Sequence, residues 1–394
     1  MSLLMTPSWW LQMKTLVLAD LHLGTDNIED QKEIANWVTS SVETTKPDSI
    51  VFLGDTFELI LPMEHASRSQ LDDHERVLTG ILDAWNPLFD HLRKSDVSRL
   101  IFIGGEHDHD ITSNKLESIL KREFSSKDIR AATHHYDVAS KSLIMHGHEL
   151  DYNRIFDVAG KRVSCIDGLT RALNAYLAQT PEIERTIREA TRRQEFSYWY
   201  SSGGIPNYIK TVGKLFGADK KMYEREVAKV FRSQELSDWL AAQKSPLVHT
   251  VGYITKQIAK FPSLLMPLYG IFRRGLRYVV KSRENSILAQ KPYVDAPDYC
   301  FGKPVKNLIL GHFHKPRETH YANGSVYNVP SPRIHVGRIT EDALGIHRNL
   351  AYALLDADRI TYSTRSTHRT IPLSSYHPSY IKTAKPKYFN SSYL

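Results

Sequence analysis

The sequence predicts a layered α/β protein whose core is interrupted by a long helical segment. Three observations lead to this prediction. Short apolar runs alternate with helical patterns between residues 14 and 150. Polar residues follow each apolar run, as they do where the strands of α/β sheets end and build a site. Strand patterns then fade over residues 151–300 and return at residue 307.

The first part of the chain contains three apolar runs of strand length. They lie at residues 14–19, 49–53 and 100–103. Helical spacing is found at residues 29–42, 71–92 and 114–124, with Pro87 as an expected break in the second helix. Residues 136–145 are typical of a hairpin that turns at Ser140 and Lys141. We therefore assign residues 1–150 to the N-terminal part of the core.

Residues 151–300 are predicted to form a helical insertion, with helices at 182–196 and 221–239. The core resumes over residues 301–372, where strands are expected at 307–310, 326–329, 351–356 and 359–362. Residues 373–394 form a tail rich in Tyr, Ser, Pro and Lys.

The composition is that of a soluble globular protein, with 41% hydrophobic and 24% charged residues among 394. The net charge is +7, and the insertion alone has 24 Lys and Arg against 15 Asp and Glu, a net of +9. The basic character therefore belongs to the insertion. It favours an acidic partner, which is a phosphate-containing substrate, an anionic membrane surface or, as second choice, nucleic acid.

Two cysteines, Cys165 and Cys300, are too few for a disulfide framework, and we expect free thiols in a reducing compartment. Residues 1–13 lack the basic start and long apolar stretch of a signal peptide. No run of about 18 apolar residues predicts a membrane span. These features predict a cytoplasmic protein that can also contact a membrane from one side.

The segment 261–281 is the candidate for such membrane contact. At 100° per residue, Leu268, Ile271, Phe272, Gly275, Leu276 and Val279 share one side of a helix. Arg273, Arg274, Arg277 and Lys281 lie on the other side. A basic amphipathic helix of this kind can lie on an anionic membrane surface. The alternative is that the same apolar stripe packs on the core of the insertion.

Histidines and carboxylates follow the strands in five clusters. These are Asp20/His22, Asp55, Glu106/His107/Asp108, His146/His148 and His312/His314. Such a donor set without cysteine suits Mn, Fe, Zn or Co. Asp55 could bridge two ions, which would then act together on a phosphoryl group. For His148, substrate contact and a purely structural hydrogen bond are both open.

The five clusters resemble, in order, the motifs of the calcineurin-like metallophosphoesterase superfamily. The motifs read Asp20-Leu-His22, Gly54-Asp55, Gly105-Glu-His-Asp108, His146 and Gly311-His-Phe-His314. Asn328-Val-Pro-Ser331 and Arg333 resemble the turn that follows the last motif. The resemblance covers about residues 14–150 and 300–365. It implies a four-layered αββα sandwich, here with a large helical insertion.

The resemblance also implies the role of each residue. Metal one would be held by Asp20, His22, Asp55 and His314. Metal two would be held by Asp55, Glu106, His146 and His312. His107 would protonate the leaving oxygen, and Asp108 would orient His107. Of the two divalent ions, Mn is the first choice, with Fe, Zn and Co as alternatives.

Glu106 departs from the family pattern, which usually has Asn at this position. A third carboxylate at the two ions lowers the net positive charge of the site by one unit. We expect tighter binding of metal two and a less acidified bridging water. The hypothesis is that Glu106 is a ligand. The alternative is that it turns away and metal two is weak or absent.

Within the superfamily, three runs resemble the UDP-2,3-diacylglucosamine diphosphatase branch. They are Asp-Leu-His-Leu-Gly24, Gly-Asp-Thr-Phe-Glu58 and Gly-His-Phe-His-Lys-Pro316. That branch cleaves a lipid-linked nucleotide-sugar pyrophosphate and has a helical lid between its fourth and fifth motifs. The resemblance implies a dinuclear phosphohydrolase that cleaves a pyrophosphate or phosphodiester bond with metal-activated hydroxide. The alternatives are a nuclease that binds DNA or RNA through the insertion and a non-catalytic scaffold. The oligomeric state stays open.

Overall fold

The computed structural model describes residues 13–24, 28–59, 74–150, 156–158, 161–163, 253, 277–294, 296–332, 334–339 and 343–372. The predicted helices at 182–196 and 221–239 lie outside these residues, as do Cys165, Arg333 and the tail after residue 372. Of the segment 261–281, residues 277–281 are described.

Strands and helices alternate in the first part of the chain, as predicted. The elements are β1 (Thr15–Ala19), α1 (Ile28–Thr45), β2 (Ser49–Leu53), α2 (His74–Ala84), α3 (Asn86–Lys94), β3 (Arg99–Ile103), α4 (Asn114–Glu123) and β4 (Asp128–Ala132). The helix predicted around Pro87 is two helices, because proline is tolerated in the first turn of α3 but not inside a longer helix. Strand β4 was not predicted. It is a polar edge strand whose side chains are mostly exposed or half-buried, so it lacks an apolar run.

The second part of the chain is richer in strands than predicted. It contains β5 (His134–Asp137), β6 (Ser142–Met145), β7 (Phe156–Val158), β8 (Lys161–Val163), β9 (Asn307–Leu310), β10 (Arg317–Tyr321), β11 (Gly324–Asn328), β12 (Ile334–Ile339), β13 (Ala343–Asp356) and β14 (Arg359–Pro372). Short 3-10 helices are η3 (His109–Thr112), η4 (His148–Leu150) and η5 (Asp298–Cys300). The predicted hairpin is confirmed, because β5 and β6 pair antiparallel. The insertion also contains the short antiparallel pair β7–β8, which was not predicted.

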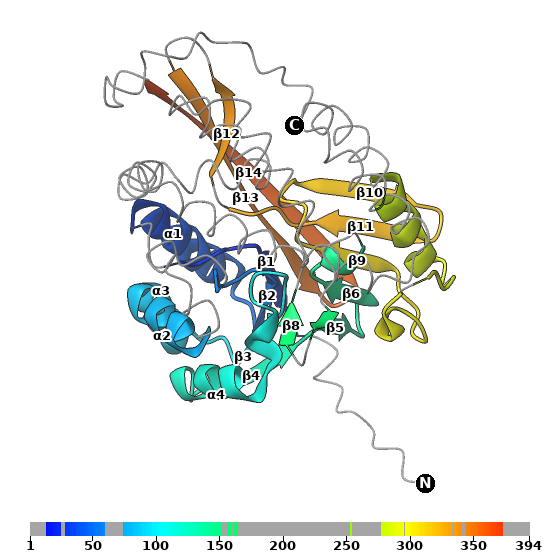
Figure 1. Ribbon diagram of the computed structural model, residues 1–394, viewed down its shortest axis with the longest axis horizontal. Helices are drawn as coiled ribbons and strands as arrows, with labels where there is room; N and C mark the ends of the chain where they lie inside the picture. The colour runs from blue at the N-terminus through cyan, green and yellow to red at the C-terminus, as the bar shows by residue number, and fades with distance from the viewer. Residues whose placement is uncertain are drawn as a thin grey trace.

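Two sheets form the centre of the molecule (Figure 1). A seven-stranded sheet has the order β12-β13-β1-β2-β3-β4, with β14 paired to β13. A five-stranded sheet has the order β10-β11-β9-β6-β5. Strands β1 to β4 are parallel to one another, and so are β6, β9 and β11. Parallel strands bring the residues that follow them to one edge of their sheet.

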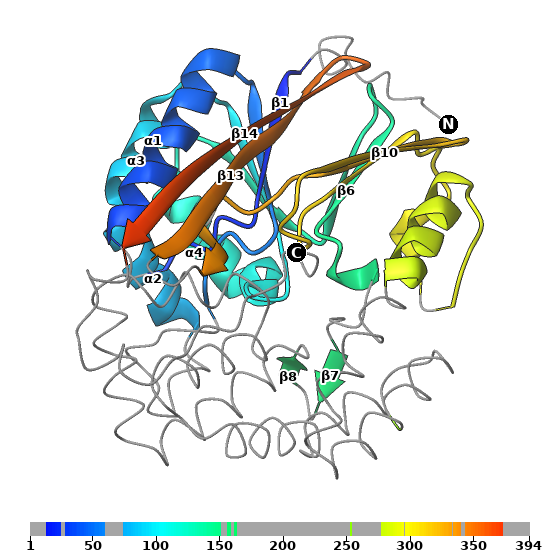
Figure 2. The same cartoon turned by 90° about the horizontal axis from the view of Figure 1, so that it is seen from above.

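Apolar side chains divide the described residues into four layers. One cluster lies between the seven-stranded sheet and helices α1 to α4, and a second joins the two sheets. A third covers the outer face of the five-stranded sheet with the helical residues 277–288, where Val280 and Ile287 are buried. Figure 2 shows α1 and α3 on one side and the yellow helix on the other, with both sheets between them. The predicted α/β class with four αββα layers is therefore confirmed.

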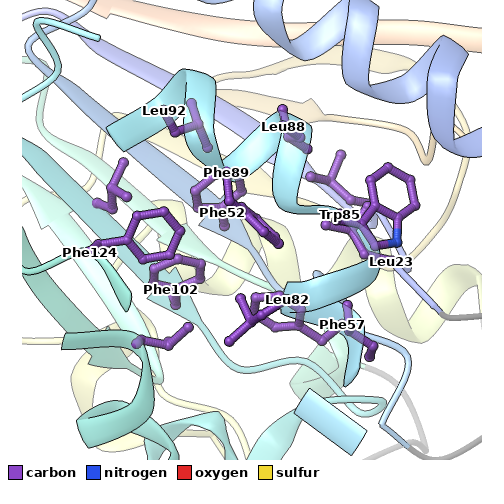
Figure 3. Close-up of a cluster of buried hydrophobic side chains, with 14 of the residues drawn as sticks. Leu23, Phe52, Phe57, Leu82, Trp85, Leu88, Phe89, Leu92, Phe102 and Phe124 are labelled. Carbon is purple, nitrogen blue, oxygen red and sulfur yellow. The ribbon is translucent and has the colours of Figure 1, made fainter. Parts of the chain in front are cut away.

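A group of buried aromatic rings fixes β2 and β3 beside each other under the helices (Figure 3). Phe52 of β2 and Phe102 of β3 stack with ring centroids 4.9 Å apart. Phe57, Phe89 and Phe124 pack around them. Their burial holds the ends of β2 and β3 in place, and these ends carry Asp55 and Glu106. None of the helices among the described residues is long and apolar enough to cross a membrane.

Candidate metal centre

All the predicted site residues follow the carboxyl ends of parallel strands and come together between the two sheets. Strands β1, β2 and β3 supply Asp20, His22, Asp55, Glu106, His107 and Asp108. Strands β6 and β9 supply His146, His148, His312 and His314. Nearly all of these side chains are buried, whereas the side chain of His314 is 25% exposed. Among these candidate ligands, His314 is therefore the one with the most exposed side chain.

The four residues predicted for metal one form a compact group. Asp20, His22, Asp55 and His314 each place a ligand atom within 4.8 Å of the others. His314 Nε2 lies 3.2 Å from His22 Nε2 and 3.3 Å from Asp20 Oδ1. Two imidazole nitrogens that face each other at this distance need a proton or a metal ion between them, because their lone pairs repel.

Glu106 points into the site and meets two histidines of the set predicted for metal two. Its Oε1 lies 2.7 Å from His312 Nδ1, and its Oε2 lies 3.0 Å from His146 Nδ1. Glu106 is therefore not turned away. His148, whose role the sequence left open, joins the same group, since Glu106, His146 and His148 have ligand atoms within 4.8 Å of one another.

Asp55 lies between the two groups. Its Oδ1 accepts a hydrogen bond from the His107 backbone N–H at 2.8 Å. Its Oδ2 is buried and accepts no hydrogen bond from the described residues. This oxygen is 3.8 Å from His22 Nε2 and 3.7 Å from His146 Nε2. A buried carboxylate oxygen without a donor is costly, and a cation shared by both groups would satisfy it. The donor set therefore fits divalent ions.

Five of the candidate ligands have left-handed backbone conformations. The φ angles are 51° for Asp20, 46° for His22, 44° for Asp55, 64° for His312 and 53° for His314. In the Asp20–His22 turn, both polar side chains face the site while Leu21 is buried in the core. Each such residue costs about 1 kcal/mol or more of strain, which persists where surrounding structure enforces it. Backbone hydrogen bonds from Asp20 N to Gly54 O and from His22 N to Asp55 O do so here.

Two glycines make room for the ligands. A Cβ at Gly54, which has φ of +67°, would lie 2.2 Å from His146 Cδ2. A Cβ at Gly105 would lie 2.2 Å from Asp55 Oδ1 and 2.5 Å from the Asp55 backbone nitrogen. Because no side chain fits at either position, the glycines of these motifs allow the strand ends to approach.

Asp108 accepts hydrogen bonds from the backbone and does not orient the His107 ring. This corrects the prediction that Asp108 orients His107. Its carboxylate accepts hydrogen bonds from the backbone N–H groups of Asp55, Thr56, Phe57 and Gly105, at 2.7–3.1 Å. The two loops that follow β2 and β3 are thereby joined. Because the Asp108 carboxylate accepts these four hydrogen bonds, it fixes the positions of the two loops and not the orientation of the His107 ring.

Glu58 takes the place predicted for Asp108. Its Oε1 lies 2.6 Å from His107 Nδ1, and its Oε2 lies 3.0 Å from His22 Nδ1. Sequence reasoning gave Glu58 no role, although it is a charged residue between the apolar Phe57 and Leu59. A carboxylate in an apolar stretch after a strand is the signal that could have identified it.

Burial and neighbouring charges shift the pKa values of the residues in the site. Burial and the negative charge of Glu106 raise the pKa of Asp55 well above its ordinary value. Burial opposes protonation of His107, but Glu58 and Asp55 outweigh it and raise the pKa of His107 to about 10. Burial would raise the pKa of Glu106, yet His312 and His146 hold it well below its usual range. Carboxylates crowded in this way favour bound cations.

Comparison with known proteins is consistent with this geometry. Residues 13–175 match the family model described as calcineurin-like phosphoesterase. The matched range contains the first four motifs, and β9 brings His312 and His314 to the same site from beyond it. The resemblance to this superfamily is confirmed for that range.

Among solved structures, a conserved uncharacterized protein from Streptococcus pneumoniae, titled a predicted phosphoesterase, shows similarity. It is 10% identical, with 91% of this chain and 98% of that chain covered and a TM-score of 0.24. No curated protein matches the sequence.

Proposed function

We propose that the calcineurin-like phosphoesterase domain matched at residues 13–175 makes this protein a phosphohydrolase that uses two divalent metal ions. The bond cleaved is a pyrophosphate or a phosphodiester. The supporting observation is that Asp55 Oδ2 is buried, accepts no hydrogen bond from the described residues and lies between two ligand groups. Asp20, His22 and His314 complete metal one, and Glu106, His146 and His312 complete metal two.

The residues of the chain divide the chemistry among them. When bound, the two ions act as Lewis acids on phosphoryl oxygens and make water a better nucleophile. His107 is buried beside Asp55, and the negative charges of Glu58 and Asp55 raise the pKa of His107 to about 10, so it can donate a proton to the leaving oxygen. Mn is the first choice of metal, and Fe, Zn and Co suit the same donors.

The proposal includes Glu106 as a ligand of metal two. Its two oxygens face His312 and His146 at 2.7 and 3.0 Å, where the Asn of related sites would offer one neutral oxygen. A unit charge beside a divalent ion is worth several kcal/mol before desolvation. We therefore expect Glu106→Asn to weaken binding of the second ion by at least about tenfold.

Metal binding and hydrolysis test these assignments together. Mn²⁺ titration by calorimetry and metal content after dialysis should give two ions for the wild type. Asp55→Asn should weaken both sites, and Glu106→Asn should weaken one. Asp90→Asn is the matched control, because Asp90 is a carboxylate on α3 that pairs with Arg93 and Lys94 away from the site. Equal second-ion affinity in Glu106→Asn and wild type would remove Glu106 from the ligand set.

Activity on three substrates separates the functional classes. The Mn-loaded protein is assayed with bis-p-nitrophenyl phosphate, a nucleotide-sugar pyrophosphate and single-stranded DNA. We expect hydrolysis that Asp55→Asn reduces about 100-fold or more, because metal ions contribute several kcal/mol to the transition state. Cleavage of DNA alone would favour the nuclease. Metal binding without hydrolysis of any substrate would support a scaffold and contradict the proposal.

The substrate class that we propose is a lipid-linked nucleotide-sugar pyrophosphate. The support is the likeness of Asp20–Gly24, Gly54–Glu58 and Gly311–Pro316 to that branch of the superfamily. The insertion also lies between the fourth and fifth motifs, where that branch has its lid. Pyrophosphate cleavage that depends on an acyl chain in the substrate is the expected result.

A membrane-facing role for residues 261–281 belongs to the same proposal. In the described part, Arg277, Tyr278 and Lys281 are exposed, and Val280 is buried against the five-stranded sheet. The buried position is thus one residue beyond the predicted Val279. The exposed basic residues are free to meet anionic headgroups while the buried side holds the helix to the protein.

A further inference from the structure

We propose that His148 is a positioning residue that fixes the ring of the metal-two ligand His146, and that the end of the insertion holds His148 in place. This inference rests on the proposed function, because it concerns a ligand of the same metal centre. The resemblance to the phosphoesterase motifs gives His148 no role. Its role follows from the surroundings of the two His146 ring nitrogens and from the contacts of the short helix η4.

The two ring nitrogens of His146 face different groups. Nε2 lies 3.2 Å from Asp20 Oδ1 and 3.7 Å from Asp55 Oδ2, so it faces the metal centre. Nδ1 lies 3.0 Å from Glu106 Oε2 and 3.1 Å from His148 Nδ1. Because Asp55 is the proposed bridge between the ions, an ion bound to Asp55 takes the lone pair of His146 Nε2.

A metal ion on Nε2 requires the ring hydrogen of His146 to be on Nδ1. That hydrogen needs an acceptor, because His146 is buried. His148 Nδ1 is within hydrogen-bonding distance and can accept through its lone pair. Glu106 Oε2 is also within reach, but the proposed function uses Glu106 as a ligand. His148 therefore supplies an acceptor for which no metal ion competes.

The contact with His146 is the one hydrogen bond that His148 Nδ1 makes with the described residues. The nearest carboxylate oxygens are Glu149 Oε2 at 3.6 Å and Glu106 Oε2 at 3.9 Å. Both distances are too long for a hydrogen bond. Two ring nitrogens at 3.1 Å share one hydrogen, because two lone pairs or two N–H groups would repel each other. With that hydrogen on His146, the hydrogen of His148 is on Nε2.

Gly147 allows the two histidine rings to meet. Its φ angle is +111°, a backbone conformation that residues with a side chain rarely adopt. The chain can therefore turn sharply between His146 and His148. Their ring centroids are 5.3 Å apart, with an interplanar angle of 47°. Both rings are buried, so neither is free to reorient in solvent.

Hydrogen bonds from the end of the insertion hold η4, which begins at His148. Glu149 Oε1 accepts from the Tyr299 hydroxyl at 2.8 Å, and Glu149 Oε2 accepts from the Gly147 N–H at 3.0 Å. Arg283 Nη1 donates to the carbonyl of the last residue of η4 at 2.9 Å. Tyr299 and Arg283 both belong to the end of the insertion. The position of His148 therefore depends on these two side chains.

The first measurement is the Mn²⁺ affinity of the full chain by calorimetry. His148→Phe keeps a ring but has no acceptor, so the Nδ1–H of His146 must turn to Glu106. The second ion should bind about 10- to 100-fold more weakly, as it does when a ligating histidine loses its outer partner. His148→Asn restores an acceptor oxygen and should recover part of this loss. His320→Phe, at a histidine on β10 with a 69% exposed side chain, is the matched control and should bind as the wild type does.

Tyr299→Phe tests whether the insertion holds His148. It removes one hydrogen bond to Glu149 and should weaken the second ion by about threefold to tenfold, with the first ion unchanged. Tyr321→Phe is the matched control, because it also loses a hydrogen bond to a buried carboxylate, that of Glu284. The control should bind both ions as the wild type does. Equal Mn²⁺ affinities of the two tyrosine variants would overturn the part of the proposal that concerns the insertion.

NMR of the Zn²⁺-loaded full chain, labelled with ¹⁵N at histidine, tests the hydrogen bond itself. Zn²⁺ has a filled d shell and does not broaden the signals of its ligands. We expect a scalar coupling between the Nδ1 nuclei of His146 and His148, with the shared hydrogen on His146. A histidine that only fills space beside the ligand would show no such coupling. Its absence in the Zn²⁺-loaded protein would overturn the role of His148.

The outcomes separate this inference from the proposed function. If the wild type hydrolyses no phosphoester, the proposed function fails, and the coupling and the second-ion affinity still test His148. If the wild type hydrolyses a phosphoester but His148→Phe binds the second ion as tightly, the function stands and the role of His148 is overturned. Should His148→Phe not fold, the coupling decides, because it is measured on the wild type.

Discussion

Asp108 shows how one side chain can organise the loops of a site without touching a substrate. It is 1% exposed and accepts four backbone hydrogen bonds from the segments that follow β2 and β3. Hydrogen bonds to a charged acceptor contribute about 1.5–3 kcal/mol each, and an unsatisfied buried donor costs a similar amount. A substitution of Asp108 therefore affects hydrogen bonds in both loops.

Asp108→Asn should lower the free energy of unfolding by about 3 kcal/mol, because the amide NH₂ replaces an acceptor and leaves buried N–H groups unpaired. Urea denaturation followed by circular dichroism measures the change. Asp90→Asn, on the surface of α3, should change it by less than about 0.5 kcal/mol. If Asp108→Asn kept full stability and lost only kcat, Asp108 would be an orienter of His107 after all.

At the scale of residues, the sequence predicts which side chains come together in the site but not which of them form hydrogen bonds with one another. Asp20, His22, Asp55 and His314 come together as predicted, because each follows a strand of known direction. The partners of His107 could not be predicted in the same way. They depend on left-handed turns at Asp20, His22 and Asp55, which rotate the loops and place Glu58 at the ring. Backbone reversals of this kind leave no periodic signal.

Among the elements, the helical residues 277–288 are fixed to the five-stranded sheet by a buried charge. The Glu284 side chain is fully buried, forms an ion pair with Arg317 of β10 and accepts a hydrogen bond from the Tyr321 hydroxyl at 2.9 Å. Arg317 lies three residues after His314. The end of the insertion is thereby connected to the strand that leaves the metal centre.

Replacing Glu284 alone should lower the free energy of unfolding more than replacing both Glu284 and Arg317. Glu284→Leu leaves the Arg317 charge without its carboxylate and should lower the free energy of unfolding by about 3 kcal/mol. Because Arg317 is 27% exposed, water offsets part of a larger loss. The double variant Glu284→Leu with Arg317→Leu should recover about 1 kcal/mol or more. Urea denaturation measures both, and a double variant that is less stable than the single one would contradict this account.

Strands with a continuous apolar run were predicted, whereas β4 and β10, which lack one, were not. The residues of β1, β2 and β9 are almost all buried, so their runs are continuous in the sequence. Strand β10 reads Arg-Glu-Thr-His-Tyr, with no apolar run, and became visible only in its pairing with β11. Edge strands are exposed on more sides and therefore carry the weakest sequence signal.

For the whole molecule, the metal centre depends on both sheets and on both ends of the chain. Strand β1 is flanked by β2 and by β13, and β6 is flanked by β5 and β9. The family match ends at residue 175, before β9 and β13. The matched range alone therefore lacks neighbours on both sheets as well as His312 and His314.

A fragment of residues 1–175 should neither unfold cooperatively nor bind Mn²⁺ with wild-type affinity. The open edges of β1 and β6 would expose apolar side chains that the complete sheets bury. Thermal denaturation and calorimetry test this expectation. A chain that ends at residue 372 is the control, because it keeps every described element. If the fragment of residues 1–175 bound Mn²⁺ with wild-type affinity, the residues after 175 would not be needed for metal binding.

The fold class was predictable because the arrangement of strands and helices in layers follows from hydrophobic patterns that extend over many residues. Alternating strands and helices before residue 150, and strands again after residue 307, were enough for the two halves of the core. The αββα order itself came from the resemblance of the motifs. Pairing of β1 with β13 joins residues more than 300 positions apart, and only the structure shows it.

The pairing of β6 with β9 has a consequence for chain entropy. The two strands are parallel neighbours, so the chain from Met145 to Asn307 is one crossover connection. A crossover needs about a dozen residues. Because the entropy of loop closure grows with the logarithm of length, extending it to the length seen here costs only about 2 kcal/mol. The length of the connection before residue 277 can thus change at little entropic cost while the strand ends that hold the metals keep their positions.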